Sequence, residues 1–171
     1  DRSADGTNYL VIHTGSRNLG KQVAEYYQNI AIDLSHGKDE LFRARDELIR
    51  RYKAEGRRSE LQEALKDLNR GFQAKEAEIP ADLAFLFGSY LEDYLHDIEI
   101  CQNFARRNRE VIAHVLLERT GITAGEAFHT IHNYIDVEER ILRKGAIAAH
   151  AGERVLIPIN MRDGSILAVG R

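Results

Sequence analysis

The longest patterned stretch of the chain covers residues 89–119 and reads SYLEDYLHDIEICQNFARRNREVIAHVLLER. Its apolar residues recur every three or four positions, which places them on one face of an α-helix. They are Leu91, Tyr94, Ile98, Cys101, Ala105, Ile112, Val115 and Leu116. The spacing predicts a long helix over residues 83–119, with a break near Gly88 and an end at Gly121.

Three segments precede this helix. Residues 9–13, YLVIH, are rich in β-forming side chains and predict a short buried strand. A helix is expected over residues 20–35. Charged side chains then supply 18 of the 33 residues from 38 to 70, and apolar residues recur among them at helical spacing. We interpret residues 38–72 as a charged helical hairpin, an insertion whose outer face is exposed.

Strands are expected after the long helix. Residues 127–134 lose the helical period and are expected to be partly extended, and residues 143–146 are expected to form a basic turn. Two apolar runs, 155–157 and 166–169, predict strands that a polar turn joins. With helices in the middle and strands at both ends, the chain is expected to have an α+β fold with a mixed sheet.

Composition excludes several classes of protein. The 171 residues carry 24 basic and 27 acidic side chains, a formal net charge of −3, and 43% of them are hydrophobic. These values are ordinary for a globular domain and argue against a disordered chain or a strongly basic nucleic-acid coat. No apolar run approaches the roughly 18 residues of a membrane span. Cys101 is the single cysteine, so an internal disulfide is excluded and a reducing, cytoplasmic setting is expected.

The chain is also expected to be a piece of a longer protein. Its one methionine is Met161, so it does not begin with an initiator methionine, and apolar segments lie close to both ends. We therefore interpret residues 1–171 as the central part of a larger domain.

Histidines are the first candidates for chemistry. His13 ends the predicted strand and precedes a glycine-rich turn, where an imidazole can bind a metal or form a hydrogen bond at a sheet edge. His129 and His132 are three residues apart. On a helix they would share one face and could bind one ion, whereas in an extended segment they would point in opposite directions. A pair of surface histidines is the alternative explanation of this spacing.

Two segments have the composition of phosphate-binding turns. Residues 14–20, TGSRNLG, place a hydroxyl and Arg17 between two glycines just before a helix, where backbone N–H groups can hold a phosphate. Arg143 and Lys144 precede Gly145, which permits close approach of the backbone. Each pattern also fits a plain helix entry or a solvated surface turn.

Two further polar segments also have two interpretations. The loop over residues 158–164 could contact a base or merely connect two strands. The cluster Arg106-Arg107-x-Arg109 could contact a nucleic-acid backbone or line an exposed helix face.

Taken in order, these segments resemble the RtcB-type RNA ligases. Residues 13–20, HTGSRNLG, are similar to that family's HSGSRGLG, and residues 90–109 contain YL-x-D, NFA and NR in the family's order. His132-Asn133 resembles the family's HN motif, and residues 143–146 match RKGA. Residues 157–161, IPINM, fall where the family has IPGSMGT. Five matches in one order make this resemblance more specific than any single motif.

The resemblance implies that the whole protein joins RNA ends. One end carries a 2′,3′-cyclic phosphate or 3′-phosphate and the other a 5′-hydroxyl, and the family uses GTP and Mn²⁺ through a histidine-linked guanylate. By resemblance, His13 and His132 are ligands of one manganese ion, and Arg17 and Lys144 bind phosphate or RNA. The residues expected against the guanine nucleotide are Pro158, Ile159, Asn160, Met161 and Asp163. The implied partners are RNA ends, from tRNA halves or damaged RNA, and an archease-like activator.

Departures from the family pattern leave alternatives open. The family's DxxCG and GNH segments supply further metal ligands, and its HGAGR segment carries the guanylated histidine; none of the three occurs in these 171 residues. The guanylated histidine is therefore expected beyond Arg171, and this chain alone is expected to be inactive. Asn160 stands where the family has serine. The alternatives are a divergent relative that binds RNA ends or a partner without ligating them, and a metal-dependent phosphoesterase.

Overall fold

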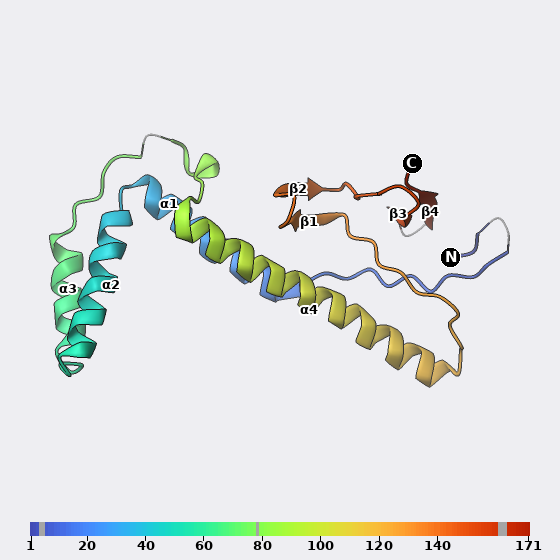
Figure 1. Cartoon of the computed structure of the whole chain (residues 1–171), viewed down its shortest axis with the longest axis horizontal. Coiled ribbons are helices and arrows are strands. Elements are labelled where there is room, and N and C mark those ends of the chain that lie inside the picture. Colours follow the sequence, from blue (N-terminus) through green and yellow to red (C-terminus); the bar gives the residue numbers. More distant parts are fainter. Residues whose placement is uncertain (4–5, 78, 161–163) are drawn as a thin grey trace. The chain divides into compact units, whose positions relative to one another are not determined.

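The computed structural model describes residues 1–3, 6–77, 79–160 and 164–171. The helical elements come first along the chain: α1 (Arg17–Ser35), α2 (Asp39–Ala54), α3 (Leu61–Gly71), the short 3₁₀ helix η1 (Ala81–Leu83) and α4 (Gly88–Thr120). Strands follow: β1 (Asn133–Asp136), β2 (Ile141–Lys144), β3 (Arg154–Asn160) and β4 (Gly164–Val169) (Figure 1). This combination of helices and small sheets confirms the predicted α+β class.

The chain divides into two compact units, and each is described separately. The first unit combines Asp1–Lys21 with Asp93–Arg171, and the second unit is Gln22–Glu92. The first unit therefore contains the four strands and most of α4, while the second contains most of α1 together with α2 and α3.

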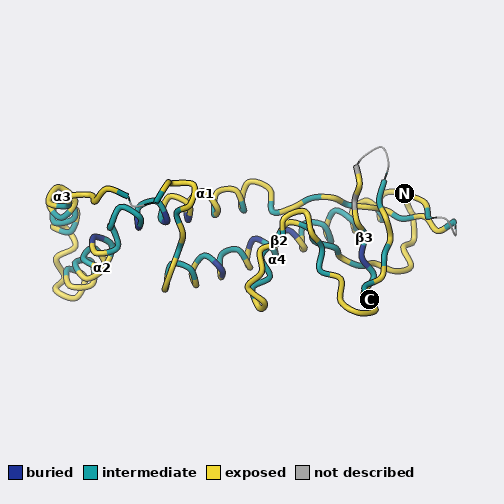
Figure 2. Tube along the Cα trace, turned by 90° about the horizontal axis from the view of Figure 1, so that it is seen from above, coloured by how far each residue is buried: buried dark blue, intermediate teal, exposed yellow. Residues whose placement is uncertain are grey.

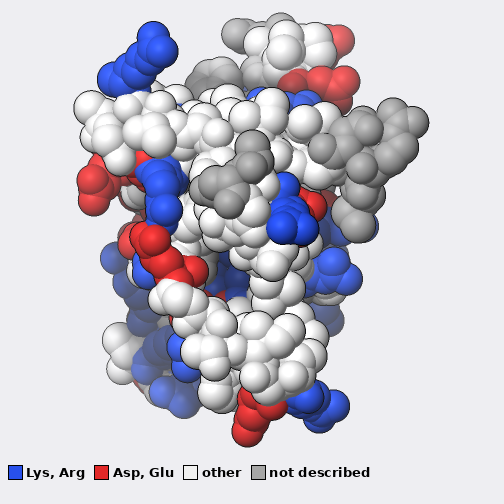
Figure 3. Space-filling view, turned by 90° about the vertical axis from the view of Figure 1, so that its right-hand side faces the viewer, with Lys and Arg blue, Asp and Glu red and all other residues white. Residues whose placement is uncertain are grey.

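Hydropathy and surface charge agree with the composition. Among the described segments, no helix is both long enough and apolar enough to cross a membrane. On the face shown in Figure 3, basic and acidic side chains are interspersed among uncharged ones. On this face, the electrostatic environment of a side chain therefore depends on its individual neighbours.

The second unit contains the predicted helical hairpin. α2 and α3 lie side by side in Figure 1, and most of their residues are exposed or half-buried (Figure 2). In the loop between them, Arg57 pairs with Glu55 at 3.1 Å and with Glu60 at 2.7 Å. The backbone N–H of Lys75 donates to the His36 carbonyl at 3.0 Å, so the two ends of the hairpin meet. The charged helices form as predicted, and their status as an insertion stays a prediction.

The long predicted helix is confirmed as α4, which has 33 residues. Gly88 and Gly121 lie at its two ends with φ of 57° and 68°, a left-handed conformation that glycine adopts without the penalty a side chain would bring. The predicted break near Gly88 and the predicted end are thus both confirmed, and Leu83 belongs to the separate turn η1. The buried residues of α4 are Leu95, Cys101 and Ala105.

The strands form two antiparallel pairs. β1 pairs with β2, with Asn133 opposite Lys144, and β3 pairs with β4, with Arg154 opposite Val169. The apolar runs predicted β3 and β4 correctly, but they did not predict β1 and β2 as a pair. The expected mixed sheet is wrong for the described residues, because both sheets have two strands and both are antiparallel. Short hairpins arise readily between neighbouring segments, whereas parallel pairing needs a longer connection.

Two local predictions are also wrong. Residues 9–13 have no regular secondary structure, and Leu10 is 58% exposed. β-forming side chains do not make a strand unless a neighbouring strand receives their backbone hydrogen bonds. Arg143 and Lys144 belong to the end of β2 and not to a turn, because the chain bends only at Gly145, where φ is 65°.

Candidate functional site

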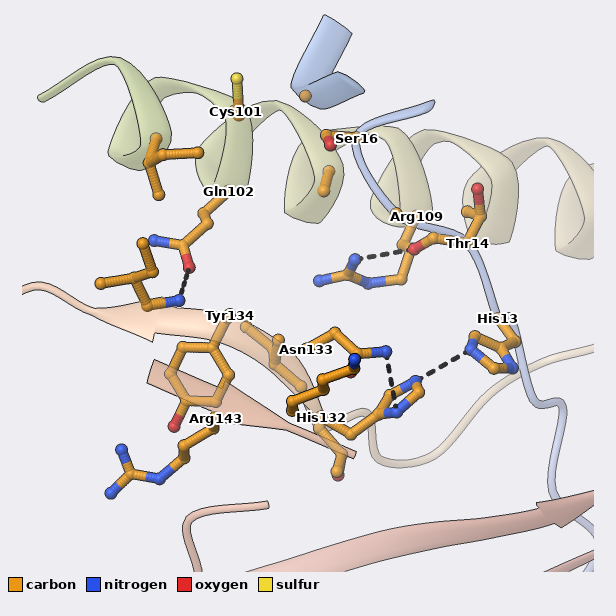
Figure 4. A pocket seen from close by; sticks show the side chains of 18 of the residues that line it. His13, Thr14, Ser16, Cys101, Gln102, Arg109, His132, Asn133, Tyr134 and Arg143 are labelled. Carbon is orange, nitrogen blue, oxygen red and sulfur yellow. Dashed lines mark hydrogen bonds between the residues drawn. The ribbon is translucent and has the colours of Figure 1, made fainter. Parts of the chain in front are cut away.

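A cavity of about 600 Å³ lies within the first unit (Figure 4). Its wall comes from residues 12–16, from one face of α4, and from residues 130–135 with the end of β2. The face of α4 contributes Tyr94, Ile98, Cys101, Gln102, Ala105 and Arg109. Segments from opposite ends of the unit's sequence therefore meet along this helix.

His13 and His132 meet at the cavity. Their Nε2 atoms are 3.0 Å apart although 119 positions separate the two residues, and their ring planes make an angle of 66°. A hydrogen bond in which one imidazole donates and the other accepts explains this distance. The distance is also compatible with two ligands of one cation: imidazole nitrogens bind zinc, for example, at about 2.0–2.1 Å, so two of them on one such ion are at most about 4.2 Å apart. Within the described segments, no third histidine, cysteine or carboxylate completes a metal-binding cluster with them.

Asn133 connects His132 to the bend after β2. Its Oδ1 accepts a hydrogen bond from the Gly145 backbone N–H at 2.8 Å, which leaves its Nδ2 as the atom 3.4 Å from His132 Nδ1. An amide N–H directed at Nδ1 favours the tautomer of His132 in which Nε2 carries the proton and donates it to His13. Binding of a cation at His132 Nε2 would require the ring proton to move to Nδ1, which is the opposite tautomer.

α4 contacts the backbone of both segments that carry the histidines. Arg109 Nη1 donates to the Thr14 carbonyl at 3.0 Å, and the Ile135 N–H donates to Gln102 Oε1 at 3.1 Å (Figure 4). Arg109 Nη2 is buried and has no hydrogen-bond partner among the described residues. These two side chains place the histidine segments against the same helix.

The Glu110 carboxylate, next to Arg109 in the sequence, contacts several basic side chains. Its carboxylate accepts hydrogen bonds from Arg106 Nε at 3.2 Å and Arg107 Nη1 at 3.1 Å, and it lies 3.7 Å from His129 Nε2. Burial, and secondly the charge of Arg106, lower the pKa of the Arg109 guanidinium, while Glu110 opposes that shift. Burial, followed by Arg106 and Arg109, likewise lowers the pKa of His129.

Of the three other predicted residues, one lines the cavity and two do not. Lys144 lines the cavity at the end of β2. His129 contacts Glu110 and is not among the cavity-lining residues, so it does not share a site with His132, as predicted for an extended segment. Arg17 begins α1 with φ of 55°, a strained conformation for a residue other than glycine, and the cavity lining does not include it.

The residues expected to contact the guanine nucleotide lie at the end of β3 and beyond it. Pro158, Ile159 and Asn160 belong to β3. The Ile159 side chain is exposed, and Ile159 is not among the described residues that line the cavity. Met161 and Asp163 fall outside the described residues.

Sequence reasoning missed Gln102. The spacing of apolar residues assigned Cys101 and Ala105 to the packed face, but it did not identify Gln102 as a candidate. A signal was nevertheless present, because Gln102 precedes Arg109 by seven positions, which is two helical turns, and so shares its face of α4. A polar side chain at the border of an apolar stripe is a candidate for contacting a neighbouring backbone.

Comparisons with known proteins give a consistent result. The family model described as tRNA-splicing ligase RtcB matches residues 3–171. The chain is 27% identical to the RNA-splicing ligase RtcB of Escherichia coli strain K12, over 95% of this chain and 36% of that protein. It is 25% identical to RNA-splicing ligase RtcB1 of another Escherichia coli strain, over the same two shares. The chain thus spans about a third of the length of these curated relatives, and no solved structure matches it.

Proposed function

The chain belongs to the RtcB family of tRNA-splicing ligases, and from that membership we propose that it is the central part of an RNA ligase. The reaction proposed for the whole protein joins an RNA 2′,3′-cyclic phosphate or 3′-phosphate to a 5′-hydroxyl with the use of GTP. The chain covers 36% of its relatives' length, so the guanylated histidine is proposed to lie outside these 171 residues. A cytoplasmic location and an archease-like activator belong to the same proposal.

The observation that supports this function best is the meeting of His13 and His132. A divalent cation, manganese in this proposal, would be held by the two Nε2 atoms, which lie 3.0 Å apart. Imidazole is a common ligand of divalent metals, and the separation is compatible with a shared ion. When bound, the ion would supply charge neutralisation for the phosphates and would help to orient them for in-line attack.

The chain's own cations would hold the phosphates. Lys144 is the last residue of β2 and is among the residues that line the cavity, where an ammonium group can bind a phosphate as a point charge. Arg17 is proposed to bind an RNA phosphate from the start of α1, and residues 158–163 are proposed to contact the nucleotide. Holding two RNA ends together would remove much of the entropic cost of joining them.

The first test is manganese binding to the full-length protein, measured by calorimetry. Wild type is expected to bind, and His13→Ala and His132→Ala are each expected to abolish binding at the same ion. His129→Ala is the matched control, since it removes an imidazole three residues from His132 that contacts Glu110 instead. Retained binding in either cavity variant would overturn the ligand assignment.

The second test is RNA joining by the same proteins. Joining of the RNA ends is expected to require both GTP and manganese. Turnover without GTP would indicate the phosphoesterase, and tight binding of RNA ends without product would indicate the non-ligating relative.

A further inference from the structure

The two histidines are carried by segments with little regular structure of their own. His13 lies in a segment without helix or strand, and His132 directly precedes the four-residue strand β1. Side chains on such segments are poorly defined unless neighbouring groups hold the backbone. The 3.0 Å separation of the Nε2 atoms therefore needs a structural cause outside the two segments.

α4 provides that cause through two side chains. Arg109 binds the carbonyl of Thr14, the residue after His13, and Gln102 binds the N–H of Ile135, three residues after His132. Residues seven apart lie on the same face of a helix, about 10 Å from one another along its axis. The helix thus fixes the positions of the backbone segments that carry His13 and His132.

The charge around Arg109 supports a role beyond an ordinary ion pair. The nearest carboxylate in sequence, Glu110, is already hydrogen-bonded to Arg106 and Arg107. Arg109 Nη2 stays buried without a partner in the described part of the chain. Arg109 is half-buried, and the Thr14 carbonyl is the acceptor that its guanidinium has, so the hydrogen bond from Nη1 accounts for the position of this side chain better than charge pairing does.

We propose that Gln102 and Arg109 are positioning residues, which hold His13 and His132 at the separation at which one cation is bound. The inference rests on the proposed metal site but concerns how that site is built. Gln102 sets the segment of His132, and Arg109 sets the segment of His13. In this proposal the two side chains act through the backbone and would not be ligands of the cation.

The test uses four variants of the full-length protein and one control variant. Gln102→Met and Arg109→Met remove the hydrogen bonds but keep unbranched side chains of similar bulk. Gln102→Glu keeps an acceptor oxygen for the Ile135 N–H, and Arg109→Lys keeps a cationic donor for the Thr14 carbonyl. Arg107→Met is the matched control, because Arg107 lies on the same helix with 76% of its side chain exposed.

Two measurements are made on each variant. Histidine-selective ¹⁵N NMR of the metal-free protein reports whether the His13 and His132 Nε2 atoms still share a hydrogen bond. Calorimetry with Mn²⁺ reports affinity, and loss of such an outer contact is expected to weaken binding about 10- to 100-fold. We expect the two Met variants to lose the shared hydrogen bond and this affinity, while Gln102→Glu and Arg109→Lys restore most of both.

The outcomes separate this inference from the function it rests on. Unchanged histidine signals in both Met variants would overturn the positioning role, as would an equal loss in Arg107→Met. If wild type fails to bind Mn²⁺ but the Met variants still lose the shared hydrogen bond, the positioning role stands and the proposed metal site fails.

Discussion

Asn133 links the candidate ligand His132 to the backbone at Gly145. Because its Oδ1 is occupied by the Gly145 N–H at 2.8 Å, the orientation of its amide is determined, and so is the atom that approaches His132. Single side chains of this kind decide the orientation of an imidazole more than the strand that carries it does.

Asn133→Leu is expected to weaken Mn²⁺ binding about 10-fold, because the Gly145 N–H loses its acceptor and the residue after His132 is no longer tied to the end of β2. Asn133→Asp keeps an acceptor oxygen for Gly145 and is expected to bind closer to wild type. Calorimetry on both variants checks this. Equal affinity of Asn133→Leu and wild type would show that the tie to Gly145 does not position His132.

Cys101 is expected to be an unreactive thiol. It is 3% exposed, and burial, then the charge of Asp97, raise the pKa of its thiol. Since the thiolate is the reactive form, labelling by a disulfide reagent at pH 8 should be slow in the native protein and fast in denaturant. Because the unfolded thiol ionises first as pH rises, its contribution to the free energy of unfolding falls above the ordinary thiol pKa. Rapid native labelling would contradict this burial.

At the scale of elements, α4 combines a packed segment with an exposed one. Leu95 is 8% exposed, whereas Leu116 on the same helix is 41% exposed. The apolar stripe predicted from the sequence includes Leu116 but not Leu95, although Leu95 directly follows Tyr94 of that stripe. Tertiary contacts decide which part of the stripe is covered.

Leu95→Ala is therefore expected to lower the free energy of unfolding by about 2–4 kcal/mol, through lost burial and a residual cavity. Leu116→Ala makes the same chemical change and should cost about 1 kcal/mol or less, because much of that side chain is already in water. Denaturant unfolding of both variants provides the comparison. Equal costs would mean that the two leucines are buried alike.

At the scale of the molecule, the candidate site and the charged hairpin belong to different units. All residues that line the cavity lie in Asp1–Lys21 or Asp93–Arg171, whereas α2 and α3 lie in Gln22–Glu92. The hairpin also closes on itself, since Lys75 N–H donates to the His36 carbonyl and His36 Nδ1 lies 3.0 Å from the Lys75 carbonyl oxygen.

Replacing residues 37–74 by an Asn-Gly turn is therefore expected to preserve the site. The ends to be joined already lie within hydrogen-bond distance, and Asn-Gly favours a tight turn. Circular dichroism should report the loss of two helices, while Mn²⁺ affinity stays within about twofold of wild type. A large loss of affinity would show that the hairpin supports the cavity.

Much of the fold could be read from local pattern. A few helical turns or a few residues are enough to identify the stripe of α4, the charged hairpin, and the apolar runs of β3 and β4. Helix and strand periods are local properties of the sequence. The family's motifs are likewise short, so His13, His132 and Lys144 could be selected as candidates from sequence. The strand predicted over residues 9–13 failed because strand formation depends on a partner that local composition does not specify.

The amino-acid sequence by itself determined the helices, two of the strands, the family and the candidate side chains. Only the tertiary structure brought His13 within 3.0 Å of His132, separated His129 from them, and assigned Gln102 and Arg109 to the backbones beside them. The physical reason is distance along the chain. Hydrogen bonds from α4 to segments on either side of it in sequence leave no periodic signature in either segment, and they form only once both segments have packed against the helix.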